Sequence, residues 1–139
     1  MSYQISVLEH PADIRLKITA SSKKDLFQGA LKGMALIIAG RKNIKKGEQL
    51  IEKQIETLSP EKNTLLVDFL NEVLAKTDIY HSVFSEIEIE ELTERKIRGT
   101  IKGQKVKEFK EEIKAATYHG LDIVQNEEGL WEAIILFDV

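Results

Sequence analysis

Two aspartates, a lysine and a histidine are the side chains of this sequence best suited to chemistry, and they lie far apart along the chain. Asp138 is followed by Val139, and we expect the main-chain carboxylate of Val139 to lie beside it. A carboxylate next to buried surface is costly unless it is paired or bound to a metal ion. If the first and last strands of the fold are neighbours, Asp13 joins this pair. The oxygen donors would then form the hard-ligand set that calcium and magnesium prefer.

A third segment, residues 112–124, is expected to bring Lys114 and His119 to the same place. Read with a period of two, its side chains alternate between two faces, as they do in a strand. Lys114 would be a counter-ion to the acids or a phosphate contact, and His119 an outer-shell hydrogen-bond donor. Simpler interpretations stay open at this point. Terminal carboxylates are often only solvated, Lys114 could be a surface lysine, and His119 could be a hydrogen-bonded structural residue.

Other kinds of site are not indicated. The chain has no cysteine and no pair of histidines at helical spacing, so it lacks the donor set of a zinc site. It also lacks a nucleophile–base constellation and a phosphate-cradling glycine loop. The residues by themselves therefore do not indicate an enzyme.

Three strands are expected to position the acids and the lysine. Residues 5–8 are apolar and predict a short first strand, after which Pro11 marks a bend or a strand edge. From Ala12 onward apolar and polar residues alternate, which predicts a half-buried strand with Asp13 at its start on the polar face. Residues 131–139 are largely apolar on both faces, which predicts a central strand buried on each side.

The first of two expected helices covers residues 23–39. Its apolar side chains recur at helical spacing and form one stripe, which should pack on a sheet. Ser22 stands three residues before Asp25, a weak relative of the capping box. Gly40 follows at the position of a C-cap. Both ends of this helix are therefore predicted from local signals.

The second expected helix begins with Ser59 as its N-cap and Pro60 at its first helical position, and it ends near Thr77. Leucine, valine and phenylalanine form a broad apolar stripe along it. The polar residues on its other side are interpreted as a solvated helix face: Asp68, Asn71 and Glu72.

The clearest hairpin covers residues 86–102, with its reversal at Thr93-Glu94. Isoleucines alternate with glutamates on one strand and mostly with basic residues on the other, so acids would face bases on a solvated sheet face. Another strand is expected within residues 48–58. Together these elements predict a single α+β domain over residues 1–139, in which a mixed or antiparallel sheet carries two helices on one face.

Composition narrows the classes of function. With 42% hydrophobic and 31% charged residues, the 139-residue chain is typical of a soluble globular domain. It shows neither the roughly 20 apolar residues of a membrane helix nor a secretory signal, so we expect a cytoplasmic protein. The net charge of −3 argues against tight direct binding of RNA, because proteins that hold phosphates usually show a basic patch.

Four motifs together resemble the archease family, in the same order and over nearly the whole chain. They are His10-Pro-Ala-Asp13, Leu65-Leu-Val-Asp-Phe-Leu-Asn71, Glu112-Ile-Lys-Ala-Ala-Thr-Tyr-His119 and Leu136-Phe-Asp-Val139. The resemblance implies a non-enzymatic protein cofactor of the RtcB-type RNA ligase, which joins RNA ends in tRNA splicing and repair. Such a cofactor promotes guanylylation of the ligase and its repeated turnover. A second role implied for the family is that of a chaperone for a tRNA cytosine methyltransferase.

The resemblance also implies roles for single residues. The metal-binding acids of the family fall on Asp13 and Asp138, with the carboxylate of Val139 nearby, and calcium is the favoured ion over magnesium or manganese. The functional lysine falls on Lys114, and His119 matches the motif without a fixed role. The chain departs from the family where Pro11 replaces a threonine and Arg15 a small residue, and residues 103–112 form a shorter, more basic connection. A metal-dependent phosphoesterase using the same acids is a rival interpretation.

Overall fold

The computed structural model describes residues 2–9, 13–40, 50–61, 63–120 and 123–139. The predicted turn around His10 and Pro11 and the basic connection after Gly40 lie outside the described residues. The elements in chain order are β1 (Tyr3–Glu9), β2 (Asp13–Ala20), α1 (Lys23–Ala39), β3 (Leu50–Leu58), α2 (Leu65–Tyr80), β4 (Ser82–Leu92), β5 (Lys96–Lys105), β6 (Ala115–Tyr118), β7 (Val124–Gln125) and β8 (Trp131–Asp138).

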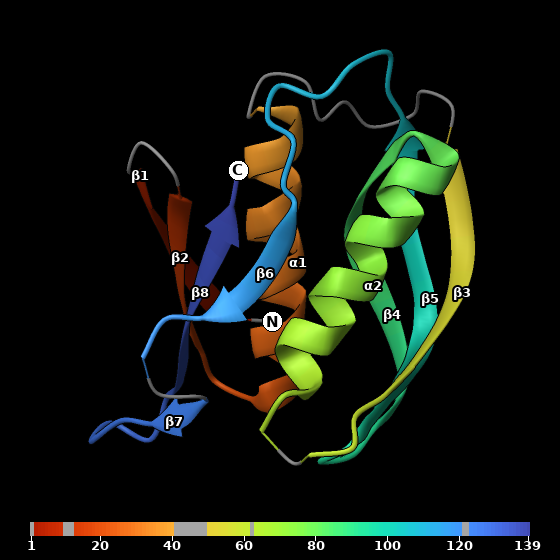
Figure 1. The fold of residues 1–139 in the computed structure, drawn as a ribbon. Coiled ribbons are helices and arrows are strands. Elements are labelled where there is room, and N and C mark those ends of the chain that lie inside the picture. Colours follow the sequence, from red (N-terminus) through yellow and green to blue (C-terminus); the bar gives the residue numbers. More distant parts are fainter. Residues whose placement is uncertain (1, 10–12, 41–49, 62, 121–122) are drawn as a thin grey trace.

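The strands form two antiparallel sheets with both helices between them (Figure 1). One sheet has the order β1-β2-β8-β6, with β7 also paired to β8, and we call it the terminal sheet. The other has the order β3-β5-β4, and we call it the hairpin sheet. Helix α1 contacts β1, β2 and β8 on one side and β4 on the other, while α2 contacts β6 and the hairpin sheet. The predicted α+β class is confirmed, but the strands divide into two sheets rather than one.

The core lies where the apolar stripes of the helices meet the inner faces of both sheets. Alternation along β2 and β8 directs one set of side chains inward and leaves the other set toward solvent. The most deeply buried side chains come from all of these elements and include Leu16, Ile18, Leu26, Leu31, Met34, Leu66, Phe69, Leu70, Phe84, Ile97, Ile101 and Phe137. The apolar side chains of the helices therefore fill the space between the two sheets and hold them together.

Helix α1 has the bounds that the sequence predicts, because its end signals are local. The Ser22 hydroxyl accepts a hydrogen bond from the Asp25 N–H at 3.1 Å. Gly40 has a φ of 78°, and its N–H donates to the Leu36 carbonyl at 2.8 Å. A serine cap at one end and a glycine at the other thus satisfy main-chain groups that the helix leaves unpaired.

Helix α2 begins at Leu65, so the predicted start at Ser59 is wrong. The Ser59 N–H donates to the Arg95 carbonyl at 2.8 Å, which holds Ser59 to the hairpin turn instead of to a helix. Thr64 precedes the helix, which ends at Tyr80, three residues beyond the predicted end. Neither helix of the described residues is long and apolar enough to span a membrane.

Strand β8 is central in the terminal sheet, as predicted, but it is not buried on each side. Ala133, Ile135 and Phe137 are buried, whereas Ile134 and Leu136 on the other face are only half-buried. Both helices lie on the inner face of this sheet, so no helix of the described structure covers its outer face.

The predicted strand over residues 112–124 divides into two short strands. Strand β6 ends at Tyr118, and Gly120 after it has a φ of 83°, which interrupts an extended backbone. Strand β7 follows over Val124–Gln125, and both strands pair with β8. The part of the segment that carries Lys114 therefore lies beside the last strand of the chain.

Candidate functional site

Asp13 and Asp138 are direct partners across the β2–β8 ladder. Residues in this relation share one face of a sheet, with Cβ atoms about 4.5–5.5 Å apart. The Asp13 side chain is half-buried and that of Asp138 is exposed, both on the outer face of the terminal sheet. The two acids that the sequence predicts to share a site are therefore neighbours in space.

Lys114 lies at the same end of the terminal sheet. Its N–H donates to the Asp138 carbonyl at 2.7 Å, and the next residue, Ala115, is the cross-strand partner of Asp138. The lysine side chain is exposed, and it forms no ion pair with another described residue. We refer to Asp13, Lys114 and Asp138 as the acid–lysine site.

Two like charges face each other at this site. Like charges directly opposite each other destabilise a strand pair. Asp138 has Asp13 on one side and uncharged Ala115 on the other. Neither acid forms a salt bridge with a residue in the described ranges. A cation from outside the chain is the simplest way to offset this repulsion.

The donor set suits a hard divalent cation held by few protein ligands. Two aspartate carboxylates are oxygen donors of the kind that bind calcium, magnesium and manganese. Among the described residues, no group of three or more histidine, cysteine or acidic side chains is placed so that it could hold a metal ion. The remaining coordination positions would be left to water or to a partner. Val139 is half-buried next to Asp138, and the part of its carboxylate in the donor set stays a prediction.

His119 stands apart from the other three predicted residues. Its N–H donates to the Ile134 carbonyl at 2.9 Å, and Ile134 precedes Asp138 by four residues on β8. Four residues of a strand span about 13 Å, too far for a direct contact with the acids. The His119 ring Nε2 lies 3.4 Å from Nη1 of Arg15, the residue that replaces a small one of the family pattern. The structure thus supports the simpler interpretation of a hydrogen-bonded histidine.

Three polar residues of α2 have partners that sequence reasoning missed. The Asn71 amide bonds to the main chain of Ala116 in β6, and Glu72 accepts a hydrogen bond from Thr57 at 2.5 Å. Asp68 accepts one from Ser59. The interpretation of these residues as a solvated face is therefore wrong. Their partners lie 9 to 45 residues away along the chain, so helical spacing carries no signal of them.

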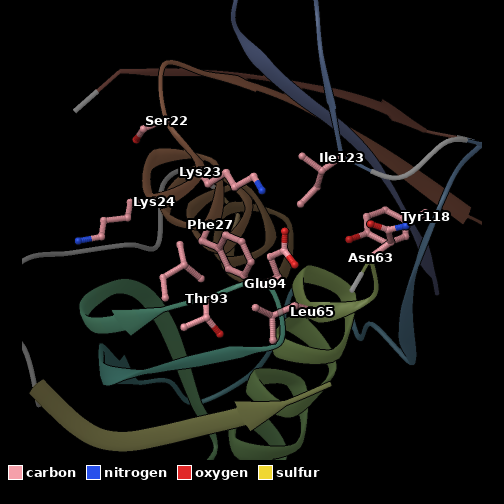
Figure 2. A pocket seen from close by; sticks show the side chains of 11 residues that line it. Ser22, Lys23, Lys24, Phe27, Asn63, Leu65, Thr93, Glu94, Tyr118 and Ile123 are labelled. Carbon is pink, nitrogen blue, oxygen red and sulfur yellow. The ribbon is translucent and has the colours of Figure 1, made fainter. Parts of the chain in front are cut away.

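A pocket of about 490 Å³ opens near the opposite end of β6 (Figure 2). Phe27 and Leu65 form part of its apolar wall, and Lys23 and Glu94 extend over it from α1 and the hairpin turn. Tyr118 lines it from β6, whereas no residue of the acid–lysine site does. The pocket and the acid–lysine site are therefore separate.

Comparisons with known proteins agree over nearly the whole chain. The profile of the Archease protein family (MTH1598/TM1083) matches residues 6–139. The chain is 30% identical over 144 residues to "Protein archease" of Methanosarcina barkeri, covering 98% of this chain and 96% of that protein.

Two solved structures have the same fold. The solution structure of Methanobacterium thermoautotrophicum protein 1598 has a TM-score of 0.73 and 25% identity, covering 97% of this chain and 98% of the other. A crystal structure from Thermotoga maritima, described as an archease and "possible chaperone", has a TM-score of 0.65 and 22% identity, covering 95% and 94%. The second likeness bears on the fold alone.

Proposed function

The chain belongs to the archease family, and on this premise we propose that it is a non-enzymatic activator of an RtcB-type RNA ligase. It would promote guanylylation of the ligase and repeated turnover in tRNA splicing and RNA repair, in the cytoplasm. The observation that supports this role most is the direct pairing of Asp13 with Asp138, with Lys114 bonded to the main chain of Asp138.

In this proposal Asp13 and Asp138 hold one divalent cation, with calcium favoured over magnesium and manganese. A bound divalent cation would stabilise the negative charge that develops on phosphoryl groups during nucleotidyl transfer. The two carboxylates would bind and orient the ion, and water or a group of the partner would take the coordination positions that they leave free. Lys114 either counters the acids or contacts a phosphate of the nucleotide.

Long-range electrostatics support an encounter with the ligase. The net charge of −3 suits approach to an enzyme that carries a basic surface for RNA, because complementary fields speed association. The same charge argues against tight RNA binding by the chain itself.

The test is a guanylylation assay of the ligase with GTP and each variant of this protein. Wild type should stimulate guanylylation, and Asp13→Ala and Asp138→Ala should each lose most of the stimulation. Glu88→Ala, which removes an exposed acid of the hairpin sheet, is the matched control and should stimulate normally. Undiminished stimulation by either aspartate variant would reject the role of the acids.

A second candidate, implied by the resemblance to the archease family, is a chaperone for a tRNA cytosine methyltransferase. A chaperone would bind its client through surface contacts and would not need the cation. Capture of the methyltransferase should then be equal with calcium and with a chelator, and equal for Asp138→Ala. Dependence of partner capture on calcium would favour the activator instead.

A further inference from the structure

Asn71 makes two hydrogen bonds to a single residue of β6. Its Oδ1 accepts from the Ala116 N–H at 2.8 Å, and its Nδ2 donates to the Ala116 carbonyl at 3.0 Å. Both main-chain groups of Ala116 are thus satisfied by one side chain of α2. This is the pattern that a neighbouring strand would provide.

Strand β6 needs such a partner because it is at the edge of the terminal sheet. In the order β1-β2-β8-β6 it pairs with β8 only. The main-chain groups on its other side have no strand to bind. Ala116 is only 2% exposed, so water has little access to these groups. Without Asn71, a donor and an acceptor would be left buried and unpaired, which is costly.

Ala116 lies one residue from the partner of Asp138 and two residues from Lys114. We infer that Asn71 is a positioning residue of the acid–lysine site, because its amide fixes the edge strand that places Lys114 beside Asp138. Asn71 acts through the backbone of β6 and touches neither acid. The effect on the strand is independent of the ligase, and the effect on cation binding rests on the proposed function.

In the hairpin sheet, an edge strand is held by a helix side chain in the same way. Strand β4 is an edge strand there, and Gln28 of α1 binds both main-chain groups of Ile87 in it. The Ile87 N–H donates to Gln28 Oε1 at 3.2 Å, and Gln28 Nε2 donates to the Ile87 carbonyl. Because this amide holds a strand without residues of the acid–lysine site, Gln28→Ala is a matched control for Asn71→Ala.

The first measurement is amide hydrogen exchange of the two alanine variants, well below their melting temperatures. Asn71→Ala should accelerate exchange in β6 about tenfold relative to the rest of the terminal sheet, and Gln28→Ala should not. Asn71→Asp keeps an acceptor for the Ala116 N–H but loses the donor, so it should fall between wild type and Asn71→Ala. Unchanged exchange in β6 of Asn71→Ala would overturn the inference.

The second measurement is titration with calcium chloride followed by calorimetry. Asn71→Ala should weaken calcium binding about tenfold, as loss of supporting residues around metal ligands typically does. Gln28→Ala should bind calcium like wild type, even if its melting temperature falls as much as that of Asn71→Ala. Equal weakening in both variants would reduce Asn71 to a general stabilising residue and contradict a positioning role.

The two measurements separate the possible failures. If wild type binds none of calcium, magnesium and manganese, the proposed function fails, and the exchange data still decide whether Asn71 fixes β6. If wild type binds calcium and Asn71→Ala binds it equally well, the positioning role fails while the proposed function stands. Faster exchange in β6 and weaker calcium binding, both confined to Asn71→Ala, would support the inference.

Discussion

The outer faces of the two sheets arrange charge in opposite ways. On the hairpin sheet Lys102 lies between two acids, with its Nζ 3.1 Å from Glu88 and 4.0 Å from Glu52. On the terminal sheet Asp13 faces Asp138, and neither has a base from the described residues. One face neutralises its own charges, and the other keeps two like charges together. The second arrangement is the one that benefits from a cation from outside.

On their inner faces, by contrast, the two sheets are held by the helices in the same way. In each sheet, one of the edge strands that contact a helix receives a single amide side chain, Asn71 on β6 and Gln28 on β4. The helices therefore secure both sheets in the same way, and the difference between the sheets lies on their solvent faces. This makes the hairpin sheet an internal control for the terminal sheet.

The largest expected effect comes from breaking the hairpin sheet itself. A Cβ atom built on Gly103 would lie 2.0 Å from the main-chain oxygen of Val83, so Gly103→Ala forces the β4–β5 ladder apart. We expect a loss of about 2–3 kcal/mol in the free energy of unfolding, measured by urea denaturation. Calcium binding by the folded fraction should stay as in wild type. A large fall in calcium affinity would show that the two sheets are not independent in function.

In metal-free buffer, neutralising one acid should change stability in opposite directions on the two outer faces. Both changes should be smaller than that caused by Gly103→Ala. Asp138→Asn removes a like-charge pair and should raise the free energy of unfolding by about 0.5 kcal/mol. Glu88→Gln removes an attractive pair with Lys102 and should lower the melting temperature. Differential scanning calorimetry with a chelator measures both. A lower melting temperature for Asp138→Asn would contradict the repulsion between the acids.

The smallest expected effect is a pH dependence of the hairpin sheet. The hydrogen bond and charge of Lys96 lower the pKa of Glu91 below its ordinary value. Because the pKa is depressed in the folded state, this stabilisation is present above the ordinary pKa of 4.5 and is lost as the pH falls through the lowered value. Melting temperature should therefore fall on acidification below about pH 4.5, and less so in Lys96→Gln. In wild type and in Lys96→Gln, the pH dependence of the melting temperature should weaken at high salt, since the side chains of Glu91 and Lys96 are accessible to solvent.

The parts of the fold that the sequence predicts are those with local signals. Helix α1 carries its own serine cap, apolar stripe and glycine end, and the β4–β5 hairpin carries its alternation of isoleucine with charge. Alternation does not show which sheet a strand joins, so the division into two sheets was not predicted. Ser59 has the form of a helix cap, but a hydrogen bond to Arg95 from 36 residues away in sequence decides its place.

The acid–lysine site cannot be predicted from local sequence signals alone. Alternation places Asp13 on a polar face, but its pairing with Asp138, 125 positions away, follows only if the first and last strands are neighbours, and the resemblance to a family strengthens that hypothesis. The helical pattern predicts a solvated Asn71, because it carries no sign of a main-chain partner 45 residues away. Residues that hold a site through the backbone leave no pattern in composition or spacing.

In the proposed site, the acids of β2 and β8 share one cation. Paramagnetic broadening of backbone amide NMR signals by Mn²⁺ would locate that cation. The amides of Asp13, Ala115 and Asp138 should broaden first as Mn²⁺ is added, and Asp138→Asn should remove this effect. Broadening centred on the glutamates of β4, or unchanged broadening at Asp13 in Asp138→Asn, would contradict the claim.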